Sequence, residues 1–255
     1  LGAVYLEAAR QRAVISRLRD SGALVAIEDA SSFTHSSRDL YLCSRVISIS
    51  RMKQPDDEIR FDEFSGLERL VISDSELSNL SFLRNSTNLE YLSVDAHVSD
   101  VSPLATSTRI KTLYLTENPI VDIGPLRSHA NLRKLGLAGT EVRDLSPLSD
   151  LIMLEELHLH NTKVVDVSPL AALKQLRRLD LSGTNVADIS PLADLSRLEY
   201  LNISETQVKD IWPLYGMPSL HAVDIRRAPI PPESRQKFRI AMPQCSVNGR
   251  APWSD

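Results

Sequence analysis

The chain has 255 residues with a formal net charge of −4, and 42% of its residues are hydrophobic but only 5% aromatic. This length and apolar content are sufficient for one elongated domain with its own core. The net negative charge argues against nucleic-acid binding, which usually requires an excess of Lys and Arg. The longest apolar run is shorter than the roughly 20 residues of a membrane-spanning helix.

The first predicted element is an amphipathic helix over residues 5–19, followed by a short strand over residues 24–27. We interpret residues 1–45 as an N-terminal cap. The chain begins at Leu1 rather than Met, with apolar residues followed by Arg10 and Arg12. A membrane anchor upstream of Leu1 is one interpretation, and a helical cap on a trimmed chain is the other. An extracytoplasmic or membrane-anchored location is therefore favoured over a cytoplasmic one.

A repeat of 22 residues dominates the middle of the chain. The phrase Asp-Ile-Ser-Pro-Leu and its variants begin at six aspartates in strict register: Asp100, Asp122, Asp144, Asp166, Asp188 and Asp210. A Leu-x-Leu phrase keeps the same interval and begins at residues 113, 135, 157, 179, 201 and 223. Weaker copies precede it at residues 47, 70 and 92. Repetition at this interval predicts stacked structural units that share one core.

Each part of the repeat has a predicted role. The Leu-x-Leu core alternates with a period of two, which predicts a short strand with its leucines facing inward. The short polar residue after the strand, for example Thr184, can bond the turn backbone. Ser190 then suits the N-cap of a brief helical or 3₁₀ turn, with Pro191 as the first helical residue.

The full pattern resembles the leucine-rich repeat, and its 22-residue length and Asp-Ile-Ser-Pro-Leu phrase resemble the internalin-type bacterial branch. The resemblance implies an α/β right-handed leucine-rich repeat solenoid. Its concave side would be a parallel β-sheet, its convex side would consist of short 3₁₀ or helical turns, and helical caps would close both ends. About nine repeats are expected over residues 46–230, although residues 52–64 are charged and irregular.

Residues 231–255 are predicted to form a C-terminal cap and tail, with a helix over 231–240 and a last strand over 242–247. Cys245 is expected to be a small buried packing residue. Cys43 lies near the other end of the rod, so no disulfide is predicted. Capped ends argue against end-to-end stacking, and a monomer is expected.

Motifs for catalysis or cofactors are lacking. No phosphate-binding loop or dinucleotide fingerprint occurs, and no cofactor is predicted. The aspartate column stands two residues before each helical turn, where a carboxylate can accept backbone N–H bonds, so a structural role is preferred over calcium binding. His158, His160 and Asp180 lie on one predicted face and are candidate zinc ligands, with exposed surface histidines as the alternative. A Ser-His-Asp catalytic site is weaker still, because no oxyanion hole is indicated.

The outward side chains of the strands are polar or aromatic rather than leucine, so the sheet face is predicted to be open. Open concave sheets are the usual binding surface of solenoids, and Tyr and Arg are enriched at interaction hot spots. Gly136 and Ala138 predict a shallow dip between Tyr114 and His158. The candidate partner-binding residues on this face are Tyr91, Tyr114, Lys134, Glu156, His158, His160, Arg178, Asp180, Tyr200, Asn202 and Asp224.

The sequence therefore predicts a non-enzymatic module that binds a protein or peptide partner on its concave face. The alternative is a regulatory or sensor repeat domain of a larger signalling enzyme, such as a GTPase, kinase or ligase. The third interpretation is that the polar and aromatic side chains only form a solvated sheet face and bind no partner.

Overall fold

The computed structural model describes residues 24–28, 46–50, 67–73 and 77–248, together with Ala13, Ile15, Ser16 and Arg19. Those four residues are helical, in agreement with the predicted N-terminal helix. The rest of that helix, the irregular segment over 52–64, Cys43 and the proposed anchor upstream of Leu1 lie outside the described residues. Within the described residues, none of the helices combines the length and the apolarity that crossing a membrane requires.

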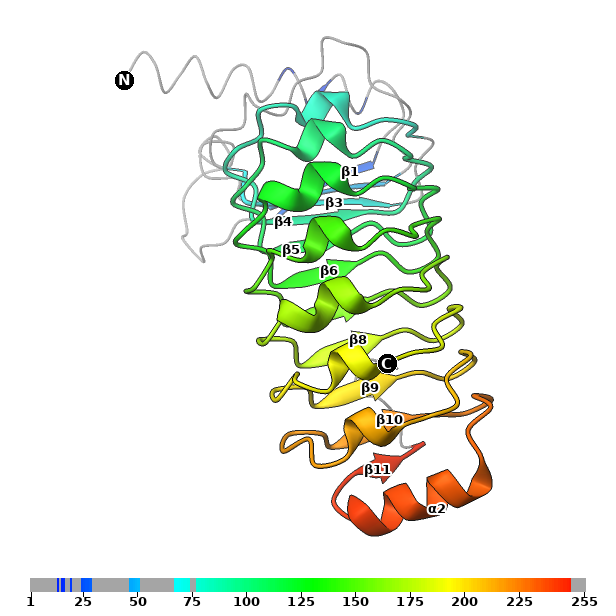
Figure 1. Cartoon of the computed structure of the whole chain (residues 1–255). Coiled ribbons are helices and arrows are strands. Elements are labelled where there is room, and N and C mark those ends of the chain that lie inside the picture. The colour runs from blue at the N-terminus through cyan, green and yellow to red at the C-terminus, as the bar shows by residue number, and fades with distance from the viewer. Residues whose placement is uncertain are drawn as a thin grey trace.

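The described residues form a single sheet of eleven strands in sequence order (Figure 1). The first two strands pair antiparallel, and every later neighbour pairs parallel. The strands are β1 (Leu24–Glu28), β2 (Val46–Ser50), β3 (Arg69–Ser73), β4 (Tyr91–Val94), β5 (Thr112–Tyr114), β6 (Lys134–Gly136), β7 (Glu156–His158), β8 (Arg178–Asp180), β9 (Tyr200–Asn202), β10 (Ala222–Asp224) and β11 (Ser246–Val247).

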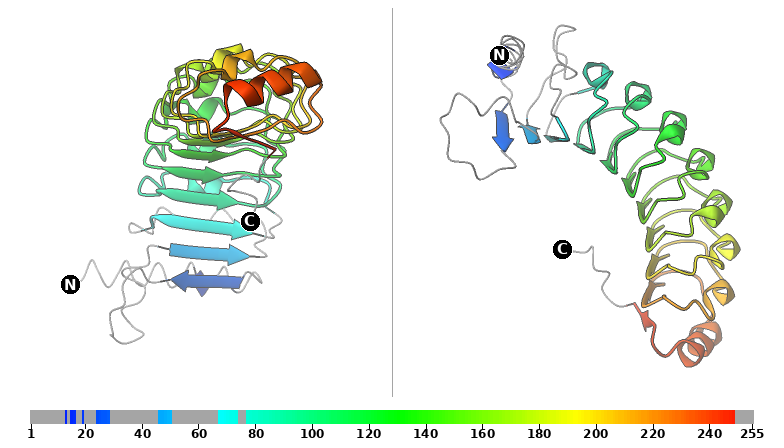
Figure 2. Two further views of the ribbon diagram at one scale, coloured as in Figure 1. Left: turned by 90° about the horizontal axis from the view of Figure 1, so that it is seen from below. Right: turned by 90° about the vertical axis from the view of Figure 1, so that its left-hand side faces the viewer.

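The sheet is curved, and its strands line the inner side of an arc (right-hand view of Figure 2). Short 3₁₀ turns line the outer side, one in each coil between β3 and β10: η2 (Ser81–Leu83), η3 (Ser102–Leu104), η4 (Gly124–Ser128), η5 (Ser146–Leu148), η6 (Ser168–Ala172), η7 (Ser190–Leu192) and η8 (Trp212–Leu214). A helical turn with its side chains is wider than the spacing of about 4.8 Å between neighbouring strands. Coils that are wider on the turn side than on the strand side stack into an arc with the strands on its inner side.

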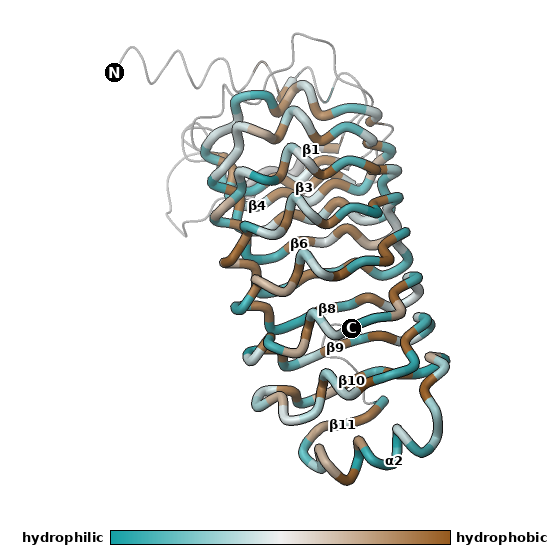
Figure 3. The backbone as a smooth tube through the Cα atoms, viewed as in Figure 1, coloured by the Kyte–Doolittle hydropathy of each residue, from teal (hydrophilic) through white to brown (hydrophobic). Residues whose placement is uncertain are grey.

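The core is one continuous layer between the sheet and the 3₁₀ turns. A single cluster of buried side chains extends from Ile15 to Cys245. In one coil, the strand leucines Leu179 and Leu181 and the later Val186 and Ile189 are at most 1% exposed, as the alternation predicts. Figure 3 shows the same succession of hydrophobic and hydrophilic segments in coil after coil. Each coil buries its apolar side chains against its neighbours, which is why the repeat must be stacked to be stable.

The starts of the 3₁₀ turns differ from the prediction in one respect. Ser190 is the first residue of η7 rather than its N-cap, and no cap side chain bonds the turn. Asp188 does this work instead, because its carboxylate accepts bonds from the Ser190 N–H and hydroxyl at 2.8 and 2.9 Å. The structural role predicted for the aspartate column is therefore confirmed, and serine is its partner rather than the cap.

The C-terminal cap consists of α2 (Pro232–Ala241) and β11. The helix lies one residue later than predicted, and the last strand is shorter than the predicted 242–247 because a turn at Cys245 precedes it. Phe238 is fully buried and meets the Tyr215 ring edge-on at a centroid distance of 5.6 Å. Burial raises the pKa of the Cys245 thiol to about 11, so this buried cysteine is a packing residue, as expected.

Candidate functional site

The candidate site is the concave face, which we define as the outward-pointing side chains of β3 to β10. The parallel register places equivalent residues of successive coils side by side, as with Glu156 and Arg178 or His158 and Asp180. The first column along the sheet consists of Arg69, Tyr91, Thr112, Lys134, Glu156, Arg178, Tyr200 and Ala222. The second consists of Val71, Ser93, Tyr114, Gly136, His158, Asp180, Asn202 and Asp224.

An aromatic cluster occupies the N-terminal half of this face. The Tyr91 and Tyr114 rings pack edge-to-face with centroids 6.1 Å apart, and the Arg69 guanidinium carbon lies 3.4 Å from the centroid of Tyr91. Both geometries are favourable for aromatic quadrupoles. Burial of its ring is the main reason that the pKa of Tyr114 is raised, so the phenol stays neutral over the physiological range.

The dip predicted at Gly136 is filled by the Tyr114 ring. A β-carbon on Gly136 would lie 2.5 Å from Tyr114 Cδ1, and Gly136 is itself buried. Glycine is therefore required here for close approach of an aromatic ring to the strand backbone. The sequence pattern showed the small residue but could not show which neighbour uses the space.

A ladder of contacts continues from the aromatic cluster toward the C-terminus. Lys134 Nζ lies 3.0 Å from Glu156 Oε1, and Arg178 Nη1 donates a bond to the same oxygen at 2.8 Å. The Arg178 guanidinium carbon is 5.6 Å from the centroid of Tyr200, whose ring stacks on His221. The carboxylate of Glu156 thus joins two cations, so the ladder is internally paired but carries one net positive charge.

The lower part of the second column is used by the fold itself. Asp180 accepts bonds from the Ser182 N–H and hydroxyl at 2.9 and 2.7 Å, and Asn202 holds Ser204 in the same way. Asp224 accepts from the Arg226 N–H and guanidinium. Asp180 and Asp224 are only 5% and 6% exposed, so the structure gives these two carboxylates a role in shaping the turn after the strand.

The two histidines do not complete a metal site. His160 Nδ1 lies 3.7 Å from Asp180 Oδ2, while burial lowers the pKa of His158 and outweighs the opposing effect of Asp180 and Glu156. Throughout the described part of the chain, no three His, Cys, Asp or Glu side chains are grouped to hold a metal ion. Asp180 also accepts two bonds from Ser182, so its carboxylate is shared with the turn after the strand.

Two residues that contact this face were absent from the predicted set of partner-binding residues. Arg69 and His221 extend the contacts at either end, through Tyr91 and Tyr200 respectively. Arg69 stands in the first column and could have been found by asking which cation precedes a tyrosine by one coil. His221 lies one residue before the first column, so its contact depends on the path of the chain as it enters the strand.

Comparison with known proteins places this geometry in a family. The model of the leucine-rich repeats, in two copies, matches residues 152–194. A comparison with curated proteins gave no significant match. The crystal structure of internalin C2 from Listeria monocytogenes is 31% identical, with a TM-score of 0.66 over 72% of this chain and 80% of that one.

Two further solved structures are similar. Internalin F from Listeria monocytogenes is 25% identical with a TM-score of 0.70 over 78% of this chain, which spans 59% of that protein. A leucine-rich repeat protein from Leptospira interrogans is 19% identical, and its TM-score of 0.74 over 88% of this chain and 60% of that one shows the fold.

The fold is thus that of a protein–protein interaction module. Thirty-one per cent identity over most of internalin C2, a matching repeat model and the parallel solenoid together decide the family. The chain belongs to the leucine-rich repeat proteins and, within them, is internalin-like.

Proposed function

We propose that this interaction module binds a protein or peptide partner across its concave face, and that the aromatic cluster and the adjoining ladder carry the contact. The observation that supports this most directly is the run of half-buried Tyr and Arg side chains from Arg69 to Tyr200, held on a rigid sheet and covered by no other element in the described residues. Tyr and Arg in such settings dominate binding energies.

The contacts within the face also favour binding. Tyr91, Tyr114 and Arg178 are each fixed by a neighbouring side chain, so little rotamer freedom remains to be lost when a partner docks. The ion pairs of the ladder are satisfied internally. A partner is therefore selected by shape and by aromatic contact in the N-terminal half, and by hydrogen bonding in the C-terminal half.

Individual candidates divide along the same line. Tyr91 and Tyr114 are proposed as apolar anchors, and Lys134, Glu156, Arg178 and Tyr200 as polar contacts with exposed edges. His158, His160 and Asn202 form the floor between them. Asp180 and Asp224 support this floor through the bonds to Ser182 and Arg226.

A leucine-rich repeat ectodomain of a plant receptor kinase from Arabidopsis thaliana offers a comparison. Its crystal structure was determined in complex with CASPARIAN STRIP INTEGRITY FACTOR 2. The ectodomain is 15% identical to this chain, with a TM-score of 0.64 over 82% of this chain and 30% of that one. At this identity the likeness concerns the fold alone. It therefore lends no support to the alternative that the chain is the regulatory part of a signalling enzyme.

The test compares three immobilised baits: the wild-type chain, a concave variant with Tyr114→Ala and Arg178→Glu, and a control variant with Val121→Ala and Arg143→Glu. Val121 and Arg143 are exposed residues outside the strands, and the charge change is the same. Far-ultraviolet circular dichroism and thermal melting check that all three are folded. A partner identified by mass spectrometry should bind the wild type and the control and lose at least tenfold in affinity for the concave variant, about 1.4 kcal/mol. Equal affinity for all three purified baits would place the contact elsewhere.

A further inference from the structure

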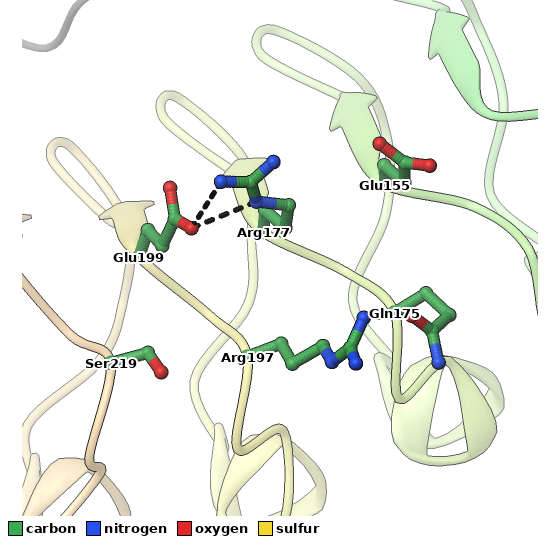
Figure 4. Close-up of a pocket in the computed structure, with 6 residues that line it drawn as sticks. All are labelled: Glu155, Gln175, Arg177, Arg197, Glu199 and Ser219. Atoms are coloured by element: carbon green, nitrogen blue, oxygen red, sulfur yellow. Dashed lines mark hydrogen bonds and ion pairs between the residues drawn. The ribbon is translucent and has the colours of Figure 1, made fainter.

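A polar hollow lies beside the concave face, where the chain enters strands β7 to β9. Its volume is about 350 Å³, and it is lined by Glu155, Gln175, Arg177, Arg197, Glu199 and Ser219 (Figure 4). Glu155, Arg177 and Glu199 immediately precede the first-column residues Glu156, Arg178 and Tyr200. The hollow is therefore built from four successive coils and adjoins the ladder without being part of it.

The walls of the hollow are rigid. Successive coils are joined there by backbone bonds, from Arg177 N–H to the Glu155 carbonyl and from Glu199 N–H to the Arg177 carbonyl, each at 2.8 Å. Because these bonds fix the main chain, the spacing of the charged side chains along the edge is set by the 22-residue repeat. A group held between them meets a preformed site.

The hollow is lined by two arginines and two glutamates, but these are not paired one with one, because Glu155 takes its partner from outside the lining. Arg177 donates to Glu199 Oε1 from Nε at 2.8 Å and from Nη2 at 2.6 Å, and Arg133 pairs with Glu155. Arg197, in contrast, donates only to the neutral Gln175 amide oxygen, at 2.5 Å. In the described part of the chain no carboxylate lies within ion-pair distance of Arg197, so both carboxylates of the hollow are matched and one guanidinium is not.

This imbalance indicates the chemistry of a ligand. A guanidinium has five N–H donors in a planar fork that fits a carboxylate bidentately, and most of those of Arg197 remain available. A dianion such as a phosphate would be repelled more strongly by Glu155 and Glu199 on the walls than a monoanion would be. A single carboxylate requires only one unmatched cation, which Arg197 supplies. A cationic ligand is disfavoured because the two glutamates already have arginine partners.

We propose that this hollow binds the carboxylate side chain of an acidic peptide segment, with Arg197 as its main contact. Arg177 forms the opposite wall, and the Gln175 amide and Ser219 hydroxyl supply further hydrogen-bonding groups. The site adds a charge-specific contact at the edge of the sheet and does not depend on the concave-face contact proposed above.

The experiment observes the arginine Nε–Hε groups of the full chain by two-dimensional ¹H–¹⁵N NMR at low ionic strength. The probe is acetyl-Glu-Glu-Glu-amide, compared with acetyl-Gln-Gln-Gln-amide and with acetate at equal carboxylate concentration. The Arg197 signal is assigned by its loss in Arg197→Gln. A saturable shift of this signal with the glutamate peptide, weaker with acetate and absent with the glutamine peptide, is expected, and added salt should reduce it.

The matched control is Arg109→Gln. Arg109 occupies the same position four coils earlier but pairs with Glu90 at 3.6 Å, so its replacement changes the charge equally without touching the hollow. The shift at Arg197 should persist in this variant and in Tyr114→Ala, which separates the result from the concave-face proposal. The inference is overturned if no saturable shift occurs, if acetate or the glutamine peptide acts as strongly, or if Arg109 shifts as much as Arg197.

Discussion

At the scale of single residues, the short polar residue after each strand makes the same hydrogen bond in successive coils. Thr140, Thr162, Thr184 and Thr206 are buried, and each hydroxyl donates to the backbone carbonyl three residues earlier at 2.6 or 2.7 Å. Asn118 takes the same place and joins its own coil to the preceding one, because its amide donates to Val94 O and accepts from the Val98 N–H. The column therefore adds a short side-chain bond to buried carbonyls of the turn, three of which also accept the threonine N–H at 3.2 or 3.3 Å.

His129 is the residue at which this core departs most from its own pattern. It is fully buried where the next coils carry Leu151, Leu173 and Leu195. Its Nδ1 lies 3.2 Å from the Leu126 carbonyl, but Nε2 finds no hydrogen-bond partner among the described residues. Burial lowers the pKa of the imidazole, and the nearby backbone of Leu126 and Leu104 opposes this only in part.

A pH-dependent stability follows from this histidine. The unfolded chain protonates a histidine near pH 6.5, while the folded chain holds His129 neutral to lower pH, so the unfolded state binds more protons below about pH 6.5. The free energy of unfolding of the wild type should therefore fall relative to His129→Leu as the pH drops below about 6.5, by at most about 1.4 kcal/mol per pH unit. Urea unfolding of both proteins over this range measures the difference. Parallel pH profiles would contradict the prediction.

Gly136 and Tyr114 provide a second test at this scale. Gly136→Ala places a β-carbon in the Tyr114 ring, so it should destabilise the protein by about 1–3 kcal/mol and displace the ring. The same substitution in a Tyr114→Ala background should have little effect, because the clash is gone. Urea unfolding of the four proteins closes a double-mutant cycle. Additive effects would show that the ring does not occupy this space.

At the scale of elements, the 3₁₀ turns depend on an aspartate that stands outside them. In most coils the carboxylate accepts from both the N–H and the hydroxyl of the serine two residues later, as Asp144 does with Ser146 at 2.8 Å in both bonds. Where Gly124 or Trp212 replaces the serine, the backbone bond to Asp122 or Asp210 alone is recorded. The backbone bond is thus the constant part of the element, and the hydroxyl bond reinforces it.

Removal of one such carboxylate tests the element. Asp144→Ala should lower the urea midpoint at neutral pH, and Asp144→Asn should lower it less because an acceptor oxygen remains. Bonds from Ser146 lower the pKa of Asp144, so its stabilisation is present above the usual carboxyl pKa and is lost as the pH falls through the lowered value. The difference between the wild type and Asp144→Asn should accordingly close below about pH 4. Asp150→Asn, an exposed carboxylate outside the motif, serves as the control, and an equal loss there would refute the assignment.

At the scale of the whole molecule, the open question for any solenoid is how its terminal coils are protected. At the C-terminal end β11 supplies only two residues, yet the backbone N–H groups of Ser246 and Asn248 bond the carbonyls of His221 and Val223 at 2.7 and 2.8 Å. The helix α2, which precedes β11, packs against the last coil through the buried Phe238, and Met242 just after the helix accepts a bond from the Gly216 N–H. A short terminal strand, together with the helix that precedes it in the chain, leaves little sheet edge on which a second chain could pair.

We therefore predict that the protein is a monomer and that its monomeric state depends on this cap. Sedimentation velocity should give a single monomeric species for the wild type at micromolar concentration. Phe238→Ala removes a fully buried ring, which should destabilise the cap by about 3–5 kcal/mol and produce concentration-dependent association as the edge of β10 becomes accessible. A variant that remains monomeric with an unchanged melting temperature would show that the cap does not protect the edge.

The sequence alone was sufficient for the fold because every coil repeats the same local instructions. The alternation around residues 179–181 predicts a strand, the threonine column predicts a turn, and the aspartate column predicts the start of a 3₁₀ turn. The strict spacing of the repeat brings equivalent residues side by side. It also placed the candidate residues on one face, because side chains of a strand alternate with a fixed period. Whether a partner uses that face remains a prediction.

Only the tertiary structure decided which side chains meet. Tyr114 lies over Gly136, Asp180 accepts two bonds from Ser182, and Arg197 has no carboxylate within ion-pair distance among the described residues of a hollow built from four coils. These outcomes depend on rotamers and on the curvature that sets how closely neighbouring coils approach. A one-dimensional pattern specifies which residues are neighbours, but packing and charge pairing between them are settled only when all the coils are in place.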